Sequence, residues 1–156
     1  MTDTSPAIPG LEPAFDVEVL LGSIEDHGLT RRGHRRVVPI VGGRVTGAIE
    51  GEILPGGADW QIVREDGAVE VDARYTARTE DGALILIHAA GIRSGDAAAL
   101  EALLRGESVD PETYYFRTVL TLEAGDPRFA ELQNVLFVTS AVRDANRVHY
   151  AAYRVT

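Results

Sequence analysis

Residues 36–60 read RVVPIVGGRVTGAIEGEILPGGADW, and this stretch decides the fold that we expect for the chain. It is rich in β-branched residues, and glycines at positions 42, 43, 47, 51, 56 and 57 interrupt it. Glycine permits positive φ and close backbone approach, so a strand that carries several glycines can bend or bulge. The stretch therefore predicts a curved sheet that closes on itself.

Alternation of apolar and polar residues predicts strands along most of the rest of the chain. With 37–45 and 48–54 in the opening stretch, we expect strands over residues 11–21, 59–64, 69–79, 84–90, 113–123, 135–143 and 148–155. Leucines at helical spacing predict one short helix over 97–105, whereas residues 22–33 are polar and predict a loop. The fold expected is all-β, a small antiparallel meander β-barrel of about 8–10 strands with one short helix.

The length of 156 residues is typical of a single domain. We expect residues 1–10 to form a flexible N-terminal arm and residues 11–156 to form one β-barrel domain. The first ten residues lack the basic start and apolar run of a signal peptide, and no apolar run approaches the ~20 residues of a membrane span. These patterns favour a cytoplasmic protein that does not bind membranes.

The charged residues exclude several kinds of chemistry. A net charge of −9 argues against nucleic acid as a partner. All fifteen basic residues are arginine and cysteine is absent, so the sequence offers no thiolate nucleophile and no lysine for a Schiff base or a phosphate-binding P-loop. The four histidines are widely spread and match no metal-binding spacing, so we expect neither a metal site nor a cofactor.

Four motifs in series resemble a known family. RRVVPIVGG is followed by LPGGADW, then by VDARYTARTEDGALI and YYFRTVLTLEAG. Over residues 11–155 the chain thereby resembles the domain-of-unknown-function family 3237, also called uncharacterised protein family 0311. The resemblance implies a small antiparallel β-barrel without a cofactor, often paired into dimers, whose genes lie near those of catabolism and secondary metabolism. We therefore expect a homodimer that acts on a small molecule.

Strand alternation places candidate catalytic residues on shared faces. Asp72 and Arg74 share one face of a strand, and Tyr115 and Arg117 share one face of another. We predict Asp72 as a base, Tyr115 as an acid or donor, and the two arginines as partners of an oxyanion or a carboxylate. A solvated outer face is the alternative for Asp72 and Arg74.

Five further residues are candidate ligand-binding residues. Trp60 could form a flat wall for an aromatic ligand or pack in the core, and Asp59, its neighbour, points to the opposite face. His88 could be an acid or base in a cavity or a partly buried histidine. Tyr75 and Arg36, which lie in the family motifs, complete the set.

These observations favour a cofactor-independent barrel enzyme. It would carry out acid–base chemistry on a carbonyl-bearing or phenolic metabolite, as an isomerase, a cyclase or a retro-aldol-type lyase. One alternative is a non-catalytic barrel that binds or carries a hydrophobic or aromatic metabolite, which a largely apolar cavity would favour. Another is a structural or interaction module, which a barrel filled by its own side chains would favour.

Overall fold

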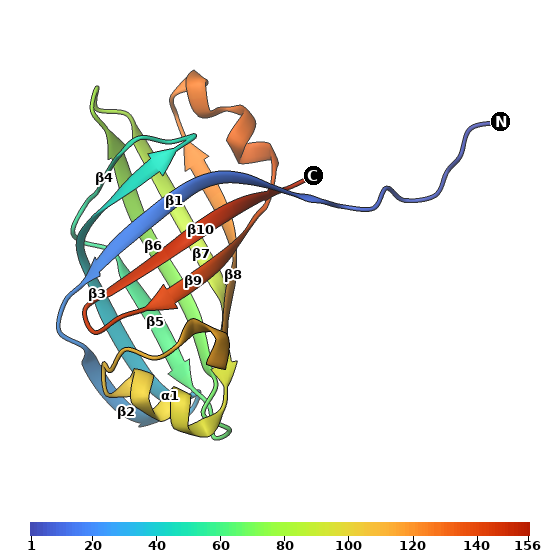
Figure 1. Cartoon of the computed structure of the whole chain (residues 1–156). Helices are drawn as coiled ribbons and strands as arrows, with labels where there is room; N and C mark the ends of the chain where they lie inside the picture. The colour runs from blue at the N-terminus through green and yellow to red at the C-terminus, as the bar shows by residue number, and fades with distance from the viewer.

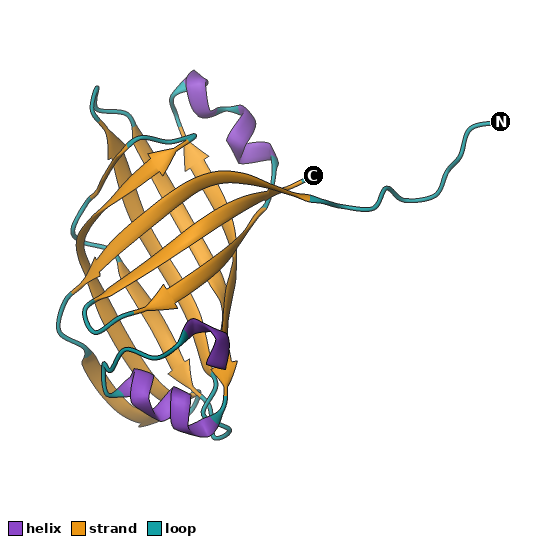
Figure 2. Cartoon of the chain, in the orientation of Figure 1, coloured by secondary structure: helices purple, strands orange, loops and turns teal.

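The computed structural model describes residues 1–156 and is built mainly of β-strands (Figure 2). The strands are β1 (Leu11–Leu21), β2 (Glu25–Thr30), β3 (Gly33–Gly47), β4 (Gly51–Ile53), β5 (Ala58–Val63), β6 (Val69–Thr79), β7 (Leu84–Gly95), β8 (Tyr114–Ala124), β9 (Phe137–Arg143) and β10 (Arg147–Val155). The helices are α1 (Ala97–Leu104) and the short 3₁₀-helices η1 (Pro111–Thr113), η2 (Pro127–Phe129) and η3 (Glu131–Asn134).

The strands close into an antiparallel barrel of eight strand positions, as the sequence predicted (Figure 1). Around the ring the order is β1, β10, β9, β8, β7 and β6, followed by β4 and β5 in one position and then by β3. Pairing of β3 with β1 closes the ring. The interior is therefore enclosed by strands on all sides, with access limited to the two ends and to gaps between strands.

The glycine-rich stretch forms the strand that closes the barrel. The first half of β3 pairs with β2 and β5, and its second half pairs with β1 and β4. Gly43 has a φ of 140°, and a Cβ atom there would lie 2.0 Å from the backbone oxygen of Glu18 on β1. The pairing register between β1 and β3 also shifts between Leu20 and Leu21. Glycine thus allows β1 to approach β3 closely where the sheet turns, as expected from the sequence.

The prediction of a loop over residues 22–33 was wrong. Residues Glu25–Thr30 form β2, which pairs with the first half of β3 outside the closed ring. Most of its side chains are exposed, and Gly28, with a φ of 73°, lies next to a shift in register. An added edge strand with no buried face shows no apolar alternation, so the pattern used for the other strands could not reveal it.

Helical segments cover both ends of the barrel (Figure 1). The predicted helix is confirmed as α1, which buries Leu100 and Leu103 at one end and stops before Gly106, whose φ is 78°. At the opposite end lie η2 and η3, and the exposed residues 1–10 extend away from the barrel wall (Figure 1). None of the helices has the length and apolar character that crossing a lipid bilayer requires.

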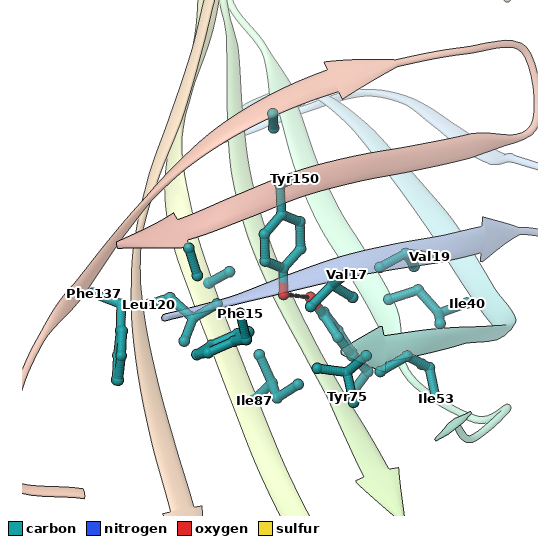
Figure 3. Close-up of a cluster of buried hydrophobic side chains, with 14 of the residues drawn as sticks. Phe15, Val17, Val19, Ile40, Ile53, Tyr75, Ile87, Leu120, Phe137 and Tyr150 are labelled. Atoms are coloured by element: carbon teal, nitrogen blue, oxygen red, sulfur yellow. Dashed lines mark hydrogen bonds between the residues drawn. The ribbon is translucent and has the colours of Figure 1, made fainter. Parts of the chain in front are cut away.

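Apolar side chains fill the half of the barrel nearer η2 and η3. The rings of Phe15 and Phe137 meet edge to face, with their centroids 5.3 Å apart, and Ile87 and Leu120 are fully buried beside them (Figure 3). Contacts of this kind between buried aromatic and branched side chains stabilise a barrel core. Because this half is packed, any space for a ligand must lie nearer the α1 end.

Candidate functional site

The structure settles which strand faces point into the barrel. On β6, Tyr75 is buried, whereas Asp72 and Arg74 are exposed. On β8, Tyr115 and Arg117 are likewise exposed. Each pair does share a face, but that face is the outer one, so none of the four predicted catalytic residues lines the interior. Alternation shows which residues share a face and leaves open which face turns inward.

A small cavity lies inside the barrel. Its volume is about 60 Å³, and eleven of its fourteen lining residues are hydrophobic. A space of this size holds roughly four water-sized groups. The residues that bring polar atoms to its wall are Asp59, Tyr75, Thr118, Thr139 and Tyr150.

Two buried tyrosines meet at this cavity (Figure 3). The hydroxyl oxygens of Tyr75 on β6 and Tyr150 on β10 lie 2.5 Å apart in a hydrogen bond. Burial raises the pKa of Tyr75 well above its usual range, and burial followed by the charge of Tyr75 does the same to the pKa of Tyr150. Both hydroxyls therefore stay protonated at neutral pH. Tyr75 was a predicted ligand-binding residue, and Tyr150 was not identified from the sequence.

A second pair of hydroxyls lies in the same wall. The Oγ1 atoms of Thr118 on β8 and Thr139 on β9 are 2.5 Å apart, and both residues are buried. Each pair of hydroxyls has two protons and uses one of them in its mutual hydrogen bond. The cavity wall therefore offers two further O–H donors to a bound oxygen atom.

Asp59 brings a carboxyl group to the cavity. Its Oδ2 accepts a hydrogen bond from Gln61 Nε2 at 2.8 Å, and its Oδ1 accepts one from the backbone N–H of Asp72 at 2.9 Å. Loss of hydration raises the pKa of the Asp59 carboxyl, although these hydrogen bonds and the charge of Arg93 act in the opposite direction. A carboxyl with a raised pKa in the wall of a cavity is typical of a group that exchanges protons during a reaction.

An interruption in the sheet makes the bond from the Asp72 N–H possible. Asp59 on β5 pairs with Ala73 on β6, and Ile62 pairs with Glu70, but the two positions between them form no ladder pair. The Asp72 N–H is therefore free of the β5 backbone and donates to the Asp59 side chain. The geometry of the strands thus orients the carboxyl group.

Three buried arginines lie on the inner face of the wall beyond Asp59. Arg36 on β3, Arg93 on β7 and Arg143 on β9 are only 9%, 2% and 6% exposed. Burial, followed by the charge of Arg143, lowers the pKa of Arg93 to about 10, so this guanidinium is still protonated at neutral pH. Arg36 was a predicted ligand-binding residue. Arg93 and Arg143 were missed, although each continues the phase of the inward-facing residues on its strand.

Several predicted residues come together on the outside of the barrel instead. A groove of about 680 Å³ on the outer surface is lined in part by Trp60, Asp72 and His88. His88 Nε2 lies 2.7 Å from Asp72 Oδ1, and these side chains are 37% and 52% exposed. Trp60 is 41% exposed and points away from the interior, opposite to Asp59, as adjacent strand residues must. This groove is a second, solvated place where acid–base groups meet.

Of the other three predicted catalytic residues, Tyr115 and Arg117 form a separate pair, and Arg74 is exposed on β6. The Arg117 guanidinium carbon lies 5.3 Å from the centroid of the Tyr115 ring, and Arg117 Nη1 donates to the Phe116 backbone oxygen at 3.0 Å. No hydrogen bond or ion pair joins either side chain to Asp72. No group of three or more His, Cys, Asp or Glu side chains is arranged to hold a metal ion.

Comparison with known proteins places the chain in a family. The family model described as a protein of unknown function, DUF3237, matches residues 9–155. The chain belongs to the DUF3237 family. A UPF0311 protein of Bradyrhizobium diazoefficiens is 41% identical over 141 residues, which cover 90% of this chain and 93% of that protein. A UPF0311 protein of Clostridium acetobutylicum is 43% identical over 125 residues, which cover 80% of this chain and 79% of the relative.

Solved structures share the DUF3237 barrel. A conserved protein of unknown function from Rhodopseudomonas palustris has a TM-score of 0.91 at 38% identity, and the match covers 97% of this chain and 100% of that one. A β-barrel-like protein from Acinetobacter baumannii has a TM-score of 0.86 at 38% identity, covering 99% and 100% of the two chains. A structure described as an enzyme from Penicillium herquei has a TM-score of 0.71 at 18% identity, covering 99% and 100%, and this likeness shows the fold alone.

Proposed function

We propose that the protein is a cofactor-independent enzyme whose acid–base chemistry takes place inside the barrel, with Asp59 as the proton-transferring group. The substrate is a small carbonyl-bearing or phenolic metabolite, and the reaction is an isomerisation, a cyclisation or a retro-aldol-type cleavage. The observation that carries the proposal is a carboxyl group in the wall of a cavity inside the barrel, held by two hydrogen bonds and with its pKa raised by loss of hydration. A raised pKa makes the carboxyl a better proton acceptor than an ordinary aspartate, which suits a group that must both take and return a proton.

The hydroxyl pairs supply the complementary role. When Asp59 removes a proton from a phenol, or from a carbon next to a carbonyl, negative charge develops on the substrate oxygen. The free O–H of the Tyr75–Tyr150 pair or of the Thr118–Thr139 pair can donate to that oxygen. Donors fixed in a site that excludes water stabilise an oxyanion more strongly than water does. The buried arginines add a positive potential that favours the same charge.

A relative supports the idea that this architecture can host a reaction. The structure from Penicillium herquei is described as that of an enzyme and shares the barrel over its whole length. At 18% identity, this support extends to the scaffold and not to any residue. The assignment of Asp59 therefore rests on its own surroundings.

The lining of the cavity favours a second function, a non-catalytic barrel that binds or carries a metabolite. Eleven hydrophobic lining residues would hold an apolar group, and the polar residues would only orient it. Both functions use the same cavity. They differ in whether one protein molecule can convert many ligand molecules.

A time course with a metabolite extract separates these functions. Protein is added in less than stoichiometric amount to an extract that spans polar to hydrophobic compounds, and every mass feature is followed. We expect one feature to disappear far beyond one equivalent as a product appears, and Asp59→Asn to slow this turnover about 10²- to 10⁴-fold. Stoichiometric withdrawal that is reversed by denaturation would identify a carrier.

Two further variants locate the chemistry. Asp72→Asn removes the carboxyl of the outer Asp72–His88 pair, and Asp16→Asn removes an exposed carboxyl on the outer face of β1. Turnover that survives in Asp59→Asn but stops in Asp72→Asn would move the reaction to the outer groove. Equal effects of all three substitutions would mean that the loss reflects net charge.

A further inference from the structure

The arginines at the α1 end carry more charge than the protein neutralises in the interior. Arg36, Arg93 and Arg143 project inward from three different strands. Asp59 is the carboxyl group whose charge acts on all three. Outside the interior, the charge of Asp26 also acts on Arg36 and that of Asp144 on Arg143, so Arg93 is the arginine that depends on Asp59 alone among the carboxylates. Inside, three guanidinium groups and one carboxylate leave an excess of positive charge in a region of low polarity, where unbalanced charge is unfavourable.

Arg93 has no hydrogen-bonding partner of its own. Its Nε and Nη1 atoms are cut off from solvent and bond to nothing. By contrast, Arg143 Nε donates to the backbone oxygen of Asp144 at 2.7 Å. A buried donor without an acceptor destabilises the folded protein, and it does so more strongly when it is charged. In a natural protein such a group is explained by a bound water or ion or by a functional role.

The free guanidinium lies beside the cavity. Its carbon is 5.6 Å from the centroid of the Phe116 ring, and Phe116 lines the cavity together with Asp59. The amide of Gln61 donates to Asp59, and Gln61 on β5 pairs with Arg36 on β3. Gln61 Oε1 is also buried without a partner. The unpaired polar atoms of Arg93 and Gln61 thus lie directly behind the lining residues Phe116 and Asp59, and not in the cavity surface itself.

We infer that this part of the cavity binds the anionic group of the substrate, with Arg93 as its main partner and with Arg36 and Arg143 adding positive potential. The substrate class is then a small carbonyl compound that also carries a carboxylate. This inference builds on the proposed function, since it names the substrate class of the same site. An incoming carboxylate would satisfy the Arg93 donors and balance the excess charge, which gives an anion a clear advantage over a neutral molecule of equal shape.

Equilibrium binding of matched ligand pairs tests the inference. Acetate is compared with acetamide, and pyruvate with pyruvamide, by titration calorimetry on the whole protein. We expect the carboxylate to bind about 10- to 100-fold more tightly than the amide in at least one pair. Arg93→Gln should abolish this preference and Arg36→Gln should weaken it. Arg44→Gln, which removes an exposed arginine from the outer face of the same strand as Arg36, should preserve the preference.

The outcomes separate this inference from the proposed function. Arg93→Gln should fold, because it removes a buried, unpaired charge, and its melting curve verifies this. Equal binding of carboxylate and amide, no saturable binding in the millimolar range, or an unchanged preference in Arg93→Gln would each overturn the inference. Asp59→Asn should keep or increase carboxylate affinity, because it removes a like charge, while losing turnover of the extract. Loss of turnover without any preference for anions would leave the proposed function standing alone.

Discussion

At Asp59, loss of hydration and hydrogen bonding act in opposite directions on one carboxyl group. Burial favours the protonated form, whereas the Gln61 amide, the Asp72 N–H and the charge of Arg93 favour the carboxylate. The net result is a raised pKa. Gln61 can serve both forms, because rotation of its amide would present its unpaired Oε1 to a protonated carboxyl. The site can therefore accept either protonation state without losing a hydrogen bond.

This raised pKa predicts how stability depends on pH. The folded state binds the Asp59 proton more tightly than the unfolded state, so stability falls as pH rises from the unfolded pKa of about 3.8 through the folded value. The Asp59→Asn variant has no carboxyl group at this position, so its stability does not fall with rising pH for this reason. We expect the variant to gain stability relative to the wild type as the pH rises above about 4, and urea unfolding at a series of pH values measures this gain.

The same measurement on Asp16→Asn provides the control. Asp16 is exposed on β1, so its substitution should change stability by a similar small amount at both ends of the pH range. A difference between Asp59→Asn and the wild type that stays constant with pH would contradict the raised pKa.

Strand alternation could predict the pairs of residues in this barrel but not their direction. Asp72 with Arg74, and Tyr115 with Arg117, do share faces, and those faces point to solvent. A barrel of this size can have a polar or an apolar lining, so polarity alone does not identify the inner face. Which face turns inward depends on how all the strands of the ring pack together, and the sequence of a single strand does not determine this.

The buried arginines had a signal that could have been used. On β7, Arg93 continues the phase of the buried Ile85, Ile87 and Ala89. Arg143 on β9 continues the phase of buried residues in the same way. A charged residue in phase with a buried apolar series marks an unusual interior position, and this pattern is visible in the sequences of both strands.

Among the strands, β7 and β8 approach each other closely at Gly91. A Cβ atom at this position would lie 2.0 Å from the backbone oxygen of Arg117. We expect Gly91→Ala to reduce the free energy of unfolding by about 1–3 kcal/mol, because the two strands must separate to admit the methyl group. Urea unfolding followed by circular dichroism measures this change.

Gly125→Ala is the matched substitution. Gly125 is exposed in the turn after β8, and an added Cβ would meet no atom within 4 Å. Its stability should remain within about 0.5 kcal/mol of the wild type. If both variants lost the same stability, close contact between β7 and β8 would not be the cause.

Among the secondary-structure elements, the sequence predicted the strands and the helix that bury one face. The ring strands and α1 have an apolar side whose period is visible in the sequence. The strand β2 has none, since it adds to the edge of β3 outside the ring. Formation of β2 depends on free backbone groups of β3 rather than on its own side chains. The sequence of residues 25–30 alone does not reveal such a partner strand.

For the whole molecule, the outer surface leads us to propose a homodimer. Trp60, Ile92, Tyr115 and Val119 are large exposed hydrophobic residues on the outer faces of β5, β7 and β8. Burial of such a face against a second copy would remove it from water. We expect light scattering after size exclusion to give twice the chain mass of 16.8 kDa.

Substitution of one residue in this face tests its role. Val119→Glu should shift the mass to that of the monomer, because a charge would be buried in the interface. Val41→Glu, which changes an exposed valine of β3, should leave the mass unchanged. A monomer mass for the wild type at every working concentration would contradict the proposal.

The Tyr75–Tyr150 pair also gives the barrel an optical property. The chain has five tyrosines, and these two are enclosed in the cavity wall with raised pKa values. In alkaline solution the enclosed pair ionises only once water reaches the interior. Above the ordinary tyrosine pKa of about 10, the unfolded chain therefore releases protons that the folded chain retains, and alkali weakens the fold. The tyrosinate absorbance that comes from this pair consequently records the opening of the barrel without any added dye.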